Sequence, residues 1–529
     1  MPSTPTFGRA AAAAPHTASA EAGRAILAEG GNALEAMVAM AATIAVVYPH
    51  MNGIGGDGFW LIREPGGKVH YIEACGFAGA EAGAAPCHAA GLDKIPPRGP
   101  LAVLTVPGAI GGWQLALELA KAGGGRVPLR DLLHNAIGHA AGGYGVSQSE
   151  ARYRPKESDS LFAAPGFADM FLVERKVPAA GTTRKVPALA ATLTRLRDAG
   201  LDDFYRGDVG AELARDLAKI DSAVTRADLK KYEAKWRAPL SLRLNEATLY
   251  NAPPPTQGLA SLIILGIFER LGVTRGESFE HIHGLIEATK RAIAIRDRVC
   301  TDFDHLDEKP ADLLTDAALA REAAMIDVGR AADIPVAPAK GDTIWMGAID
   351  ASGRAVSYIQ SLYWEYGSGC VLPRTGVLMQ NRGMSFSLAP GALNPLVPGR
   401  RPFHTLNPPL ATFADGRVMS YGTMGGDGQP QFQAQVFSRA RFGMSLDKAL
   451  HAPRFLWGRT WGAESSTLKL ENRFDTGVVR ALERAGHTVE VWPADYDDSF
   501  GHAGALVRQP GGRIQAQHDP RSDGGAAGI

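Results

Sequence analysis

The chain has 529 residues, and its composition, 45% hydrophobic and 21% charged, is typical of a soluble globular protein. Lys+Arg 55 balance Asp+Glu 55, so the formal net charge is +0, which argues against a protein that wraps nucleic acid or coats an anionic membrane. A chain of this length predicts about two to four domains, or one unusually large one.

The N-terminus and the cysteines indicate the compartment. Residues 1–31 show no secretory signal, because proline, histidine and glutamate interrupt the alanines and no basic region precedes an apolar core. The most apolar stretch, 36–49, is too short to span a bilayer. Widely spaced thiols without a CxxC pair predict neither disulfides nor a zinc site; they are Cys75, Cys87, Cys300 and Cys370. We therefore expect a cytoplasmic protein with no metal, no other cofactor, and no nucleic-acid or membrane partner.

The first half of the chain has mainly helical patterns. After an irregular start, residues 17–31 and 32–47 predict two helices, the second apolar nearly all round and therefore part of the core. Residues 53–74 contain two strand-like runs joined by a PGG turn, which is typical of a hairpin. The 3.6-residue periodicity of 104–142 and 188–300 predicts mostly helices.

The pattern changes to strands after a linker. Residues 307–342 end in a Pro/Ala-rich tail without a core face, which is typical of a surface linker. Hairpins are predicted over 343–363 and 410–426, helices follow, and a last strand pair covers 504–517. Hairpins in both halves, with helices outside them, favour stacked antiparallel sheets covered by helices.

Several motifs are spread along the whole chain. They include P-x-x-x-G-I-G-G-D-G-F at 49–59, TVPGAIGGW at 105–113, TRADLKKY at 225–232, PPPTQG at 253–258 and DPRSDGGAAG at 519–528. In this order they resemble the motifs of the γ-glutamyltranspeptidase family of N-terminal nucleophile hydrolases. The resemblance implies an α+β fold, a four-layer αββα sandwich made as a precursor that cuts itself before a threonine. A large chain, 1–342, ending in a flexible linker, and a small chain, 343–529, would then form one intertwined domain.

Thr343 matches the threonine at which the family's precursors are cut, so the resemblance implies cleavage of the Asp342–Thr343 bond. The released α-amine, with a pKa of about 8, can take the proton of the threonine's own hydroxyl and make it a nucleophile. Without the resemblance, Thr343 would be only a β-branched residue at the edge of a strand. Ile344 and Trp345 replace a threonine and a histidine that usually follow the nucleophile in the family.

Two further features belong to the implied catalytic machinery. Gly425 and Gly426 match the pair whose backbone N–H groups form the family's oxyanion hole, where glycine allows a close approach and a positive φ. Ser361 replaces a threonine that supports the nucleophile by hydrogen bonding, and strand alternation puts it on the same face as Tyr363.

The GIGGDG loop at 53–58 precedes a strand instead of opening a helix, so we expect it to pack beside the site and not to bind a dinucleotide.

The residues that hold a γ-glutamyl donor in the family are changed here. Cys75 stands where the family has its carboxylate-binding arginine, and Tyr363 stands where it has an asparagine. Arg382 and Ser385 replace an acidic pair, and His404 and Thr405 replace a pair of serines. An arginine in place of an acid would repel an ammonium group and bind a carboxylate through a fork of donors, and Tyr363 would shorten the pocket. We therefore predict a small anionic amide as substrate, held by Arg382 with the other four small-chain residues around it.

These changes resemble the oxamate amidohydrolase branch of the family, in which oxamate becomes oxalate and ammonia through a threonine acyl-enzyme. The alternatives are a γ-glutamyl hydrolase or transpeptidase acting on glutathione-type donors, and a cephalosporin-acylase-like amidase. An unprocessed binding or transport protein on the same fold is a further alternative, against which the retained Thr343, Gly425 and Gly426 argue. The two chains of one precursor are the expected partners, and a homodimer of such pairs is left open.

Overall fold

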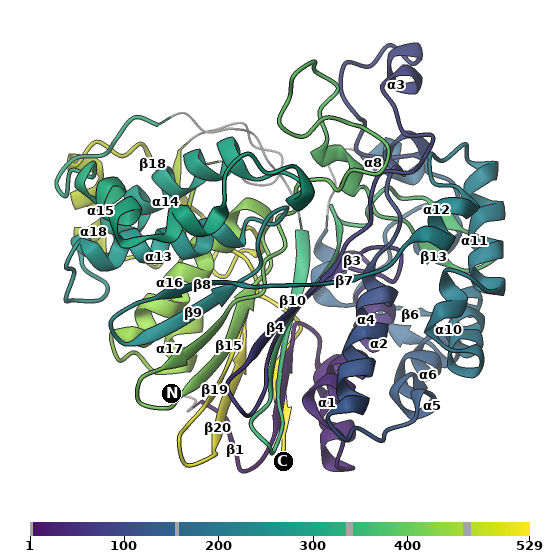
Figure 1. Ribbon diagram of the computed structural model, residues 1–529, viewed down its shortest axis with the longest axis horizontal. Coiled ribbons are helices and arrows are strands. Elements are labelled where there is room, and N and C mark those ends of the chain that lie inside the picture. The colour runs from purple at the N-terminus through teal and green to yellow at the C-terminus, as the bar shows by residue number, and fades with distance from the viewer. Residues whose placement is uncertain (1–3, 154–157, 335–341, 459–466) are drawn as a thin grey trace.

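The protein is a layered sandwich of two sheets between two sets of helices. The structure is a computed structural model, and it describes residues 4–153, 158–334, 342–458 and 467–529. Within these residues two seven-stranded sheets lie face to face, and helices cover the outer face of each, which gives four layers in the order αββα (Figure 1). The predicted stack of antiparallel sheets covered by helices is confirmed.

The first sheet combines strands from both halves of the chain. In spatial order its strands are β1 (Thr6–Phe7), β20 (Ile514–His518), β19 (Ala503–Arg508), β15 (Val418–Thr423), β14 (Leu410–Phe413), β9 (Ala247–Asn251) and β8 (Leu240–Arg243). The helical layer on its outer face consists of α13 (Gly258–Arg270), α14 (Phe279–Val299), α15 (Asp316–Ala324), α16 (Gln429–Arg441), α17 (Leu446–His451) and α18 (Thr476–Arg484). A small sheet beside it contains β16 (Phe455–Trp457), β17 (Leu468–Glu471) and β18 (Val489–Trp492).

The second sheet carries the strand that begins with Thr343. In spatial order its strands are β21 (Gly525–Gly528), β2 (Ala11–Ala14), β10 (Asp342–Ile349), β11 (Ala355–Tyr363), β3 (Asp57–Arg63), β4 (Val69–Ala74) and β7 (Lys235–Arg237). Its helical layer consists of α1 (Thr17–Ala28), α2 (Ala33–Val47), α4 (Ala109–Ala122), α5 (Leu129–Leu132), α6 (His134–Gly142), α10 (Pro187–Ala199), α11 (Asp208–Lys219) and α12 (Arg226–Lys231).

Short elements complete the structure. They are the helices α3 (Ala85–Ala89), α7 (Gln148–Arg152), α8 (Ser158–Phe162) and α9 (Phe167–Phe171), and the two-stranded pairs β5 (Tyr144–Gly145) with β6 (Thr183–Arg184) and β12 (Val371–Leu372) with β13 (Val377–Leu378). Among the described residues, no helix combines the length and the apolar character that crossing a bilayer requires. The four cysteines are unpaired and buried.

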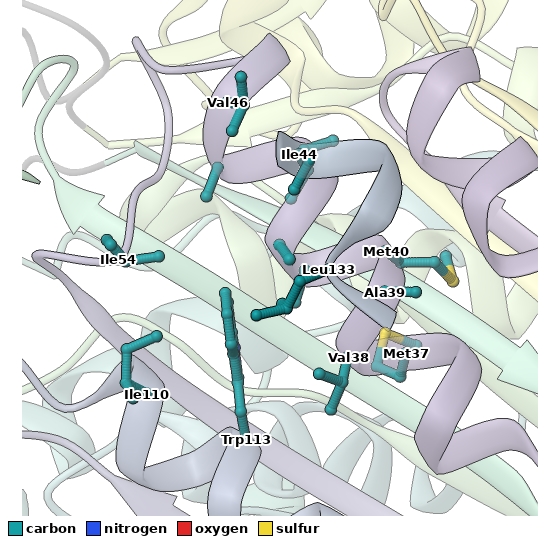
Figure 2. Packing of buried hydrophobic residues seen from close by; sticks show 14 of the residues in the cluster. Met37, Val38, Ala39, Met40, Ile44, Val46, Ile54, Ile110, Trp113 and Leu133 are labelled. Atoms are coloured by element: carbon teal, nitrogen blue, oxygen red, sulfur yellow. The ribbon is translucent and has the colours of Figure 1, made fainter. Parts of the chain in front are cut away.

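The central helix α2 forms the core between the second sheet and its helical layer. Asn32 and Glu35 close its first turn as a capping box, and every residue of the helix is buried. Figure 2 shows Val38 of α2 close to Trp113 of α4, with Leu133 beside them; all three side chains are fully buried. The predicted core helix is therefore confirmed.

Strand alternation divides the second sheet between two cores. Ile344 and Met346 of β10 face α2 and the helical layer, whereas Trp345 faces the first sheet together with Phe59 of β3. This alternation follows from the two-residue period of a strand. It places the side chains on the Trp345 face in the space between the two sheets.

Two predictions about the chain course are wrong. The start is not irregular, because Ala11–Ala14 form the buried strand β2 between β10 and β21; four identical small residues show no alternation in the sequence. The prediction of mostly helices over 188–300 is confirmed, although the short strands β7, β8 and β9 lie between them. The region 307–342 contains α15, whose Leu319 is fully buried against the helical layer, so a linker would be shorter than predicted. Residues 335–341 and the side chain of Asp342 lie outside the described part of the structure.

Candidate active site

Thr343 is the second residue of β10, the strand that crosses the middle of the sandwich in Figure 1. The register between β10 and β11 shifts between Asp342 and Ile344, so Thr343 occupies a β-bulge, a feature that re-aims a side chain. The residue is fully buried, at 0% exposure, and the strand that follows pairs with β2 on one side and β11 on the other. These strand pairings fix the backbone that carries the Thr343 side chain.

Trp345 fixes the spacing of the two sheets next to Thr343. Its indole lies against Gly422 of β15 and Gly504 of β19; a Cβ atom at Gly422 would lie 2.1 Å from Trp345 Cδ1, and one at Gly504 2.4 Å from Cζ3. The indole Nε1 donates a hydrogen bond to Ser357 Oγ at 2.9 Å. Trp345 therefore packs where only glycine fits on the facing strands.

The predicted oxyanion glycines follow the end of β15. β15 ends at Thr423, the residue after Gly422, and the chain then turns through Gly425 and Gly426, with φ of +121° and +50°. A Cβ atom on Gly425 would lie 2.8 Å from the ring of Phe432. The short 3-10 helix η6 (Gly426–Gly428) follows and leads into α16. Glycine is required at Gly425 both by the backbone conformation and by the close contact.

Gln257 joins the glycine loop to the loop before β14. Its side-chain Nε2 donates to the carbonyl oxygens of Thr405 at 2.8 Å and Gly426 at 2.7 Å, and its Oε1 accepts from Arg296 at 2.8 Å. The backbone N–H of Gln257 donates to the carbonyl of His404 at 2.9 Å. One buried amide therefore fixes the oxyanion candidates relative to two substrate-binding candidates.

Ser361 lies in β11 opposite Thr343 and directly beside Asp57 of β3. Tyr363 pairs with Asp342 across the β10–β11 ladder, so Thr343 faces this stretch of β11. The Ser361 hydroxyl is buried and accepts a hydrogen bond from the N–H of Tyr363 at 2.8 Å, where Tyr363 leaves the strand with a φ of +85°. Ser361 thus stabilises the turn that carries Tyr363 into the site.

Arg382, the first residue of the 3-10 helix η5 (Arg382–Ser385), is a buried cation with unused donors. Its guanidinium carbon lies 3.8 Å from the centroid of the Tyr363 ring, and its Nη1 lies 3.5 Å from Thr405 Oγ1. Its Nε and Nη2 have no hydrogen-bond partner among the described residues. Burial lowers the pKa of Arg382 to about 10, so the side chain stays cationic at neutral pH. An open fork of this kind is the geometry that binds a carboxylate.

Ser385 and the phenol of Tyr363 lie on the Arg382 side of the site. Burial raises the pKa of Tyr363, whereas the charge of Arg382 and the neighbouring Ser385 hydroxyl lower it. The phenol is therefore neutral at physiological pH and can donate a hydrogen bond.

His404 faces Asp57 on the other side. Its Nε2 lies 3.6 Å from Asp57 Oδ2, and neither ring nitrogen has a hydrogen-bond partner among the described residues. Burial lowers the pKa of His404 well below its usual value, so the ring is neutral and this contact is not an ion pair. Phe59 contacts the ring edge to face at 4.9 Å between centroids.

The structure brings the predicted site residues together at one end of the sandwich, and it adds two that the sequence did not identify. Asp57 was expected to pack beside the site, yet its carboxyl group faces His404. Gln257 was only part of a family motif. An acid inside a glycine-rich loop before an apolar strand was the one available signal for Asp57; for Gln257 the sequence offered none.

A second buried cluster has the residue types of a metal site but lies outside the candidate active site. Ligand atoms of His283, Glu287 and His487 lie within 4.8 Å of one another. His283 Nδ1 and His487 Nε2 are 2.9 Å apart and share a hydrogen bond, and Lys290 Nζ lies 2.7 Å from a Glu287 oxygen. The two histidines are therefore joined by a shared proton, and Glu287 is paired with the ammonium group of Lys290, so these groups already have the partners that a metal ion would replace.

Comparisons with known proteins cover almost the whole chain. A family model described as gamma-glutamyltranspeptidase matches residues 19–529. An oxamate amidohydrolase proenzyme of Klebsiella pneumoniae is 48% identical over 520 residues, which is 98% of this chain and 98% of that protein. A glutathione hydrolase-like proenzyme of Bacillus subtilis is 39% identical over 521 residues, 97% of each. A solved structure, cephalosporin acylase from Bacillus halodurans, matches with a TM-score of 0.89 and 29% identity over 100% of this chain and 97% of that one.

Proposed function

The chain belongs to the gamma-glutamyltranspeptidase family, and we propose that it is a self-cleaving amidohydrolase that converts oxamate to oxalate and ammonia with Thr343 as nucleophile. The substrate comes from the relative that is 48% identical over 98% of both chains. The observation that carries the proposal on this chain's own residues is the buried fork of Arg382, whose Nε and Nη2 have no partner among the described residues.

Maturation uses the same hydroxyl as turnover. Thr343 Oγ attacks the carbonyl carbon of Asp342, the peptide bond becomes an ester, and water hydrolyses it to a carboxylate and a free hydroxyl. The products are the large chain 1–342 and the small chain 343–529, whose new α-amine lies beside the Thr343 hydroxyl. Because β10 pairs with β2 of the large chain, the two products stay together in one sheet.

Turnover proceeds in two acyl-transfer steps. The Thr343 α-amine takes the hydroxyl proton as Oγ attacks the amide carbon, and the N–H groups of Gly425 and Gly426 stabilise the oxyanion. The amide nitrogen takes the proton and leaves as ammonia, which gives an oxalyl ester on Thr343. Water then attacks the ester with the same base, and oxalate is released while the hydroxyl is restored.

Substrate orientation depends on the charge of Arg382. The carboxylate of oxamate would accept hydrogen bonds from Nε and Nη2, while the Tyr363 ring under the guanidinium limits the length of the acyl group. Ser385, Thr405 and His404 supply hydroxyl and imidazole groups around the bound acid. A short acid with its amide on the adjacent carbon fits this arrangement.

The alternative is a γ-glutamyl hydrolase, and one observation favours it. Asp57 is an acid in the pocket with one oxygen that accepts no hydrogen bond among the described residues, and an acid can bind the α-ammonium of a γ-glutamyl group. The carboxylate of the same group would then bind Arg382. The relative named as glutathione hydrolase-like is 39% identical, so this reading has a counterpart among the comparisons.

Ammonia release separates the two functions. Purified, cleaved enzyme is expected to release ammonia from oxamate with a kcat/KM at least about tenfold higher than that for a γ-glutamyl anilide, a difference of about 1.4 kcal/mol in transition-state binding. A higher kcat/KM on the anilide would overturn the oxamate assignment. The unpaired, buried cysteines support a cytoplasmic location as part of the same proposal.

A further inference from the structure

Asp57 is a buried acid in the active site that the proposed chemistry does not use. It is 1% exposed, and its Oδ1 accepts three hydrogen bonds, from the N–H groups of Gly76 at 3.1 Å and Gly108 at 3.0 Å and from Gln380 Nε2 at 3.2 Å. Its Oδ2 accepts none among the described residues and lies 3.6 Å from His404 Nε2. The carboxyl group is therefore held through one oxygen, while the other faces the imidazole of His404.

Among the described residues, Arg382 is the one cation that acts on the pKa of Asp57. Arg382 and Asp57 act on each other's pKa as opposite charges, and His404 is neutral because burial lowers its pKa. The other titratable groups that interact with Asp57 in the described part of the chain have pKa values raised by burial and are neutral; they are Cys75, Tyr205, Tyr232 and Tyr358. The described groups around Asp57 thus carry one positive charge, on Arg382, and one negative charge, on Asp57 itself, apart from the α-amine of Thr343 in the cleaved enzyme.

A second carboxylate in this pocket upsets that balance. A substrate bound to Arg382 brings a negative charge next to the carboxylate of Asp57, and two close, buried carboxylates do not both stay ionised. Burial already raises the pKa of Asp57 to about 7, so the acid needs little further shift to take up a proton at neutral pH. Once protonated, Oδ2–H is a donor for the ligand or for His404 Nε2, which replaces repulsion by a hydrogen bond.

We propose that a carboxylate ligand enters this pocket together with one proton, which Asp57 takes up. The proton comes from solvent: the ionised Asp57 becomes the neutral acid as the ligand anion binds Arg382, and it returns the proton when the product leaves. The inference rests on the proposed function, because it takes Arg382 as the carboxylate site. No bond other than the O–H bond of Asp57 forms or breaks.

The expected pH dependence follows from the direction of the shift. Below pH 7 Asp57 is already protonated in the free enzyme, so binding takes up no further proton and the Kd for the ligand is flat. Above pH 7 the free enzyme has lost that proton and must regain it, so the Kd rises with pH, towards tenfold per pH unit. The Kd stops rising once the pH exceeds the raised pKa that Asp57 has in the complex.

Titration calorimetry of the cleaved enzyme with oxalate tests the proposal. Measured at pH 6 and pH 8 in two buffers of different ionisation enthalpy, proton uptake is expected to rise from about zero to nearly one per site. Asp57→Asn keeps an oxygen acceptor for the three donors but cannot titrate, so its uptake at pH 8 should fall by most of that proton and its Kd should change little with pH. Glu73→Gln is the matched control: this buried acid contacts Arg401 and Arg237 instead, and its variant should keep the uptake of the wild type.

The outcomes distinguish the two proposals. Absence of oxalate binding at any pH would overturn the proposed function and this inference with it. Binding without proton uptake, or uptake that persists in Asp57→Asn because the Thr343 amine or the ligand carries it, would overturn the inference alone. Should Asp57→Asn fail to fold, an infrared difference spectrum of the wild type decides: a carboxylic-acid C=O band that appears on oxalate binding at pH 8 is expected, and its absence would overturn the assignment.

Discussion

Replacing Arg382 by Gln removes the only charge that the account assigns to the substrate carboxylate. Two of its donors, Nε and Nη2, have no partner among the described residues, so a bound carboxylate can accept two charge-assisted hydrogen bonds of about 1.5–3 kcal/mol each. Part of this is lost to desolvation of the two charges, and about 3–4 kcal/mol is expected to remain. At 1.36 kcal/mol per tenfold, kcat/KM for oxamate should fall about 150- to 900-fold.

The assay compares oxamate with oxamide, in which the carboxylate is replaced by a second neutral amide. Cleaved Arg382→Gln should hydrolyse oxamide within about threefold of the wild type. Oxamide has no carboxylate, so neither enzyme forms the arginine–carboxylate interaction with it. Arg401→Gln is the control for removing a buried arginine: Arg401 is paired with Glu73 and Asp302, and its loss should not discriminate between the two substrates. An equal loss of kcat/KM on oxamate and oxamide in Arg382→Gln would refute the carboxylate site.

Three further substitutions test the residues that form the oxyanion loop and hold the site in place. Gly425→Ala places a side chain at a φ of +121° and should lower kcat on oxamate by about 10²-fold or more with little change in KM; an unchanged kcat would argue against the oxyanion role. Gln257→Leu leaves two buried carbonyl groups without this donor and should lower stability by about 2–4 kcal/mol, seen as a lower midpoint of thermal unfolding; an unshifted midpoint would contradict it. Gly422→Ala would force Trp345 to move and should cost about 1–3 kcal/mol, whereas Gly66→Ala, in open space, should leave the midpoint unchanged; equal midpoints would contradict the packing argument.

The parts of the fold that could be predicted are those with a local signal. The hairpin that carries Thr343 consists of two runs rich in apolar and β-branched residues around a tight turn, and the structure has it as β10 and β11. The four alanines of β2 have no such local signal; they form a strand because β10 and β21 pair with its two edges. The conformation of such a segment depends on the strands that pair with it, and the local sequence does not specify those partners.

The candidate site divides in the same way. Thr343 could be identified because it matches the nucleophile of the family, and Arg382 because an arginine stands where the family has an acid. The carboxyl group of Asp57 acquires its setting from donors on Gly76, Gly108 and Gln380, which are far apart in the chain and meet only in the folded protein. Nothing near Asp57 in the sequence specifies those contacts, so its place in the pocket became evident only in three dimensions.

Mass spectrometry of the purified protein tests the central claim, that Thr343 is an N-terminal nucleophile, most directly. The wild type is predicted to give two chains, 1–342 and 343–529, and a sample quenched during oxamate turnover should carry an oxalyl group on the peptide that begins with Thr343. Thr343→Ala should remain one full-length chain without activity. A wild type that stays uncut, or a Thr343→Ala variant that is cut at the same bond and hydrolyses oxamate, would contradict the account.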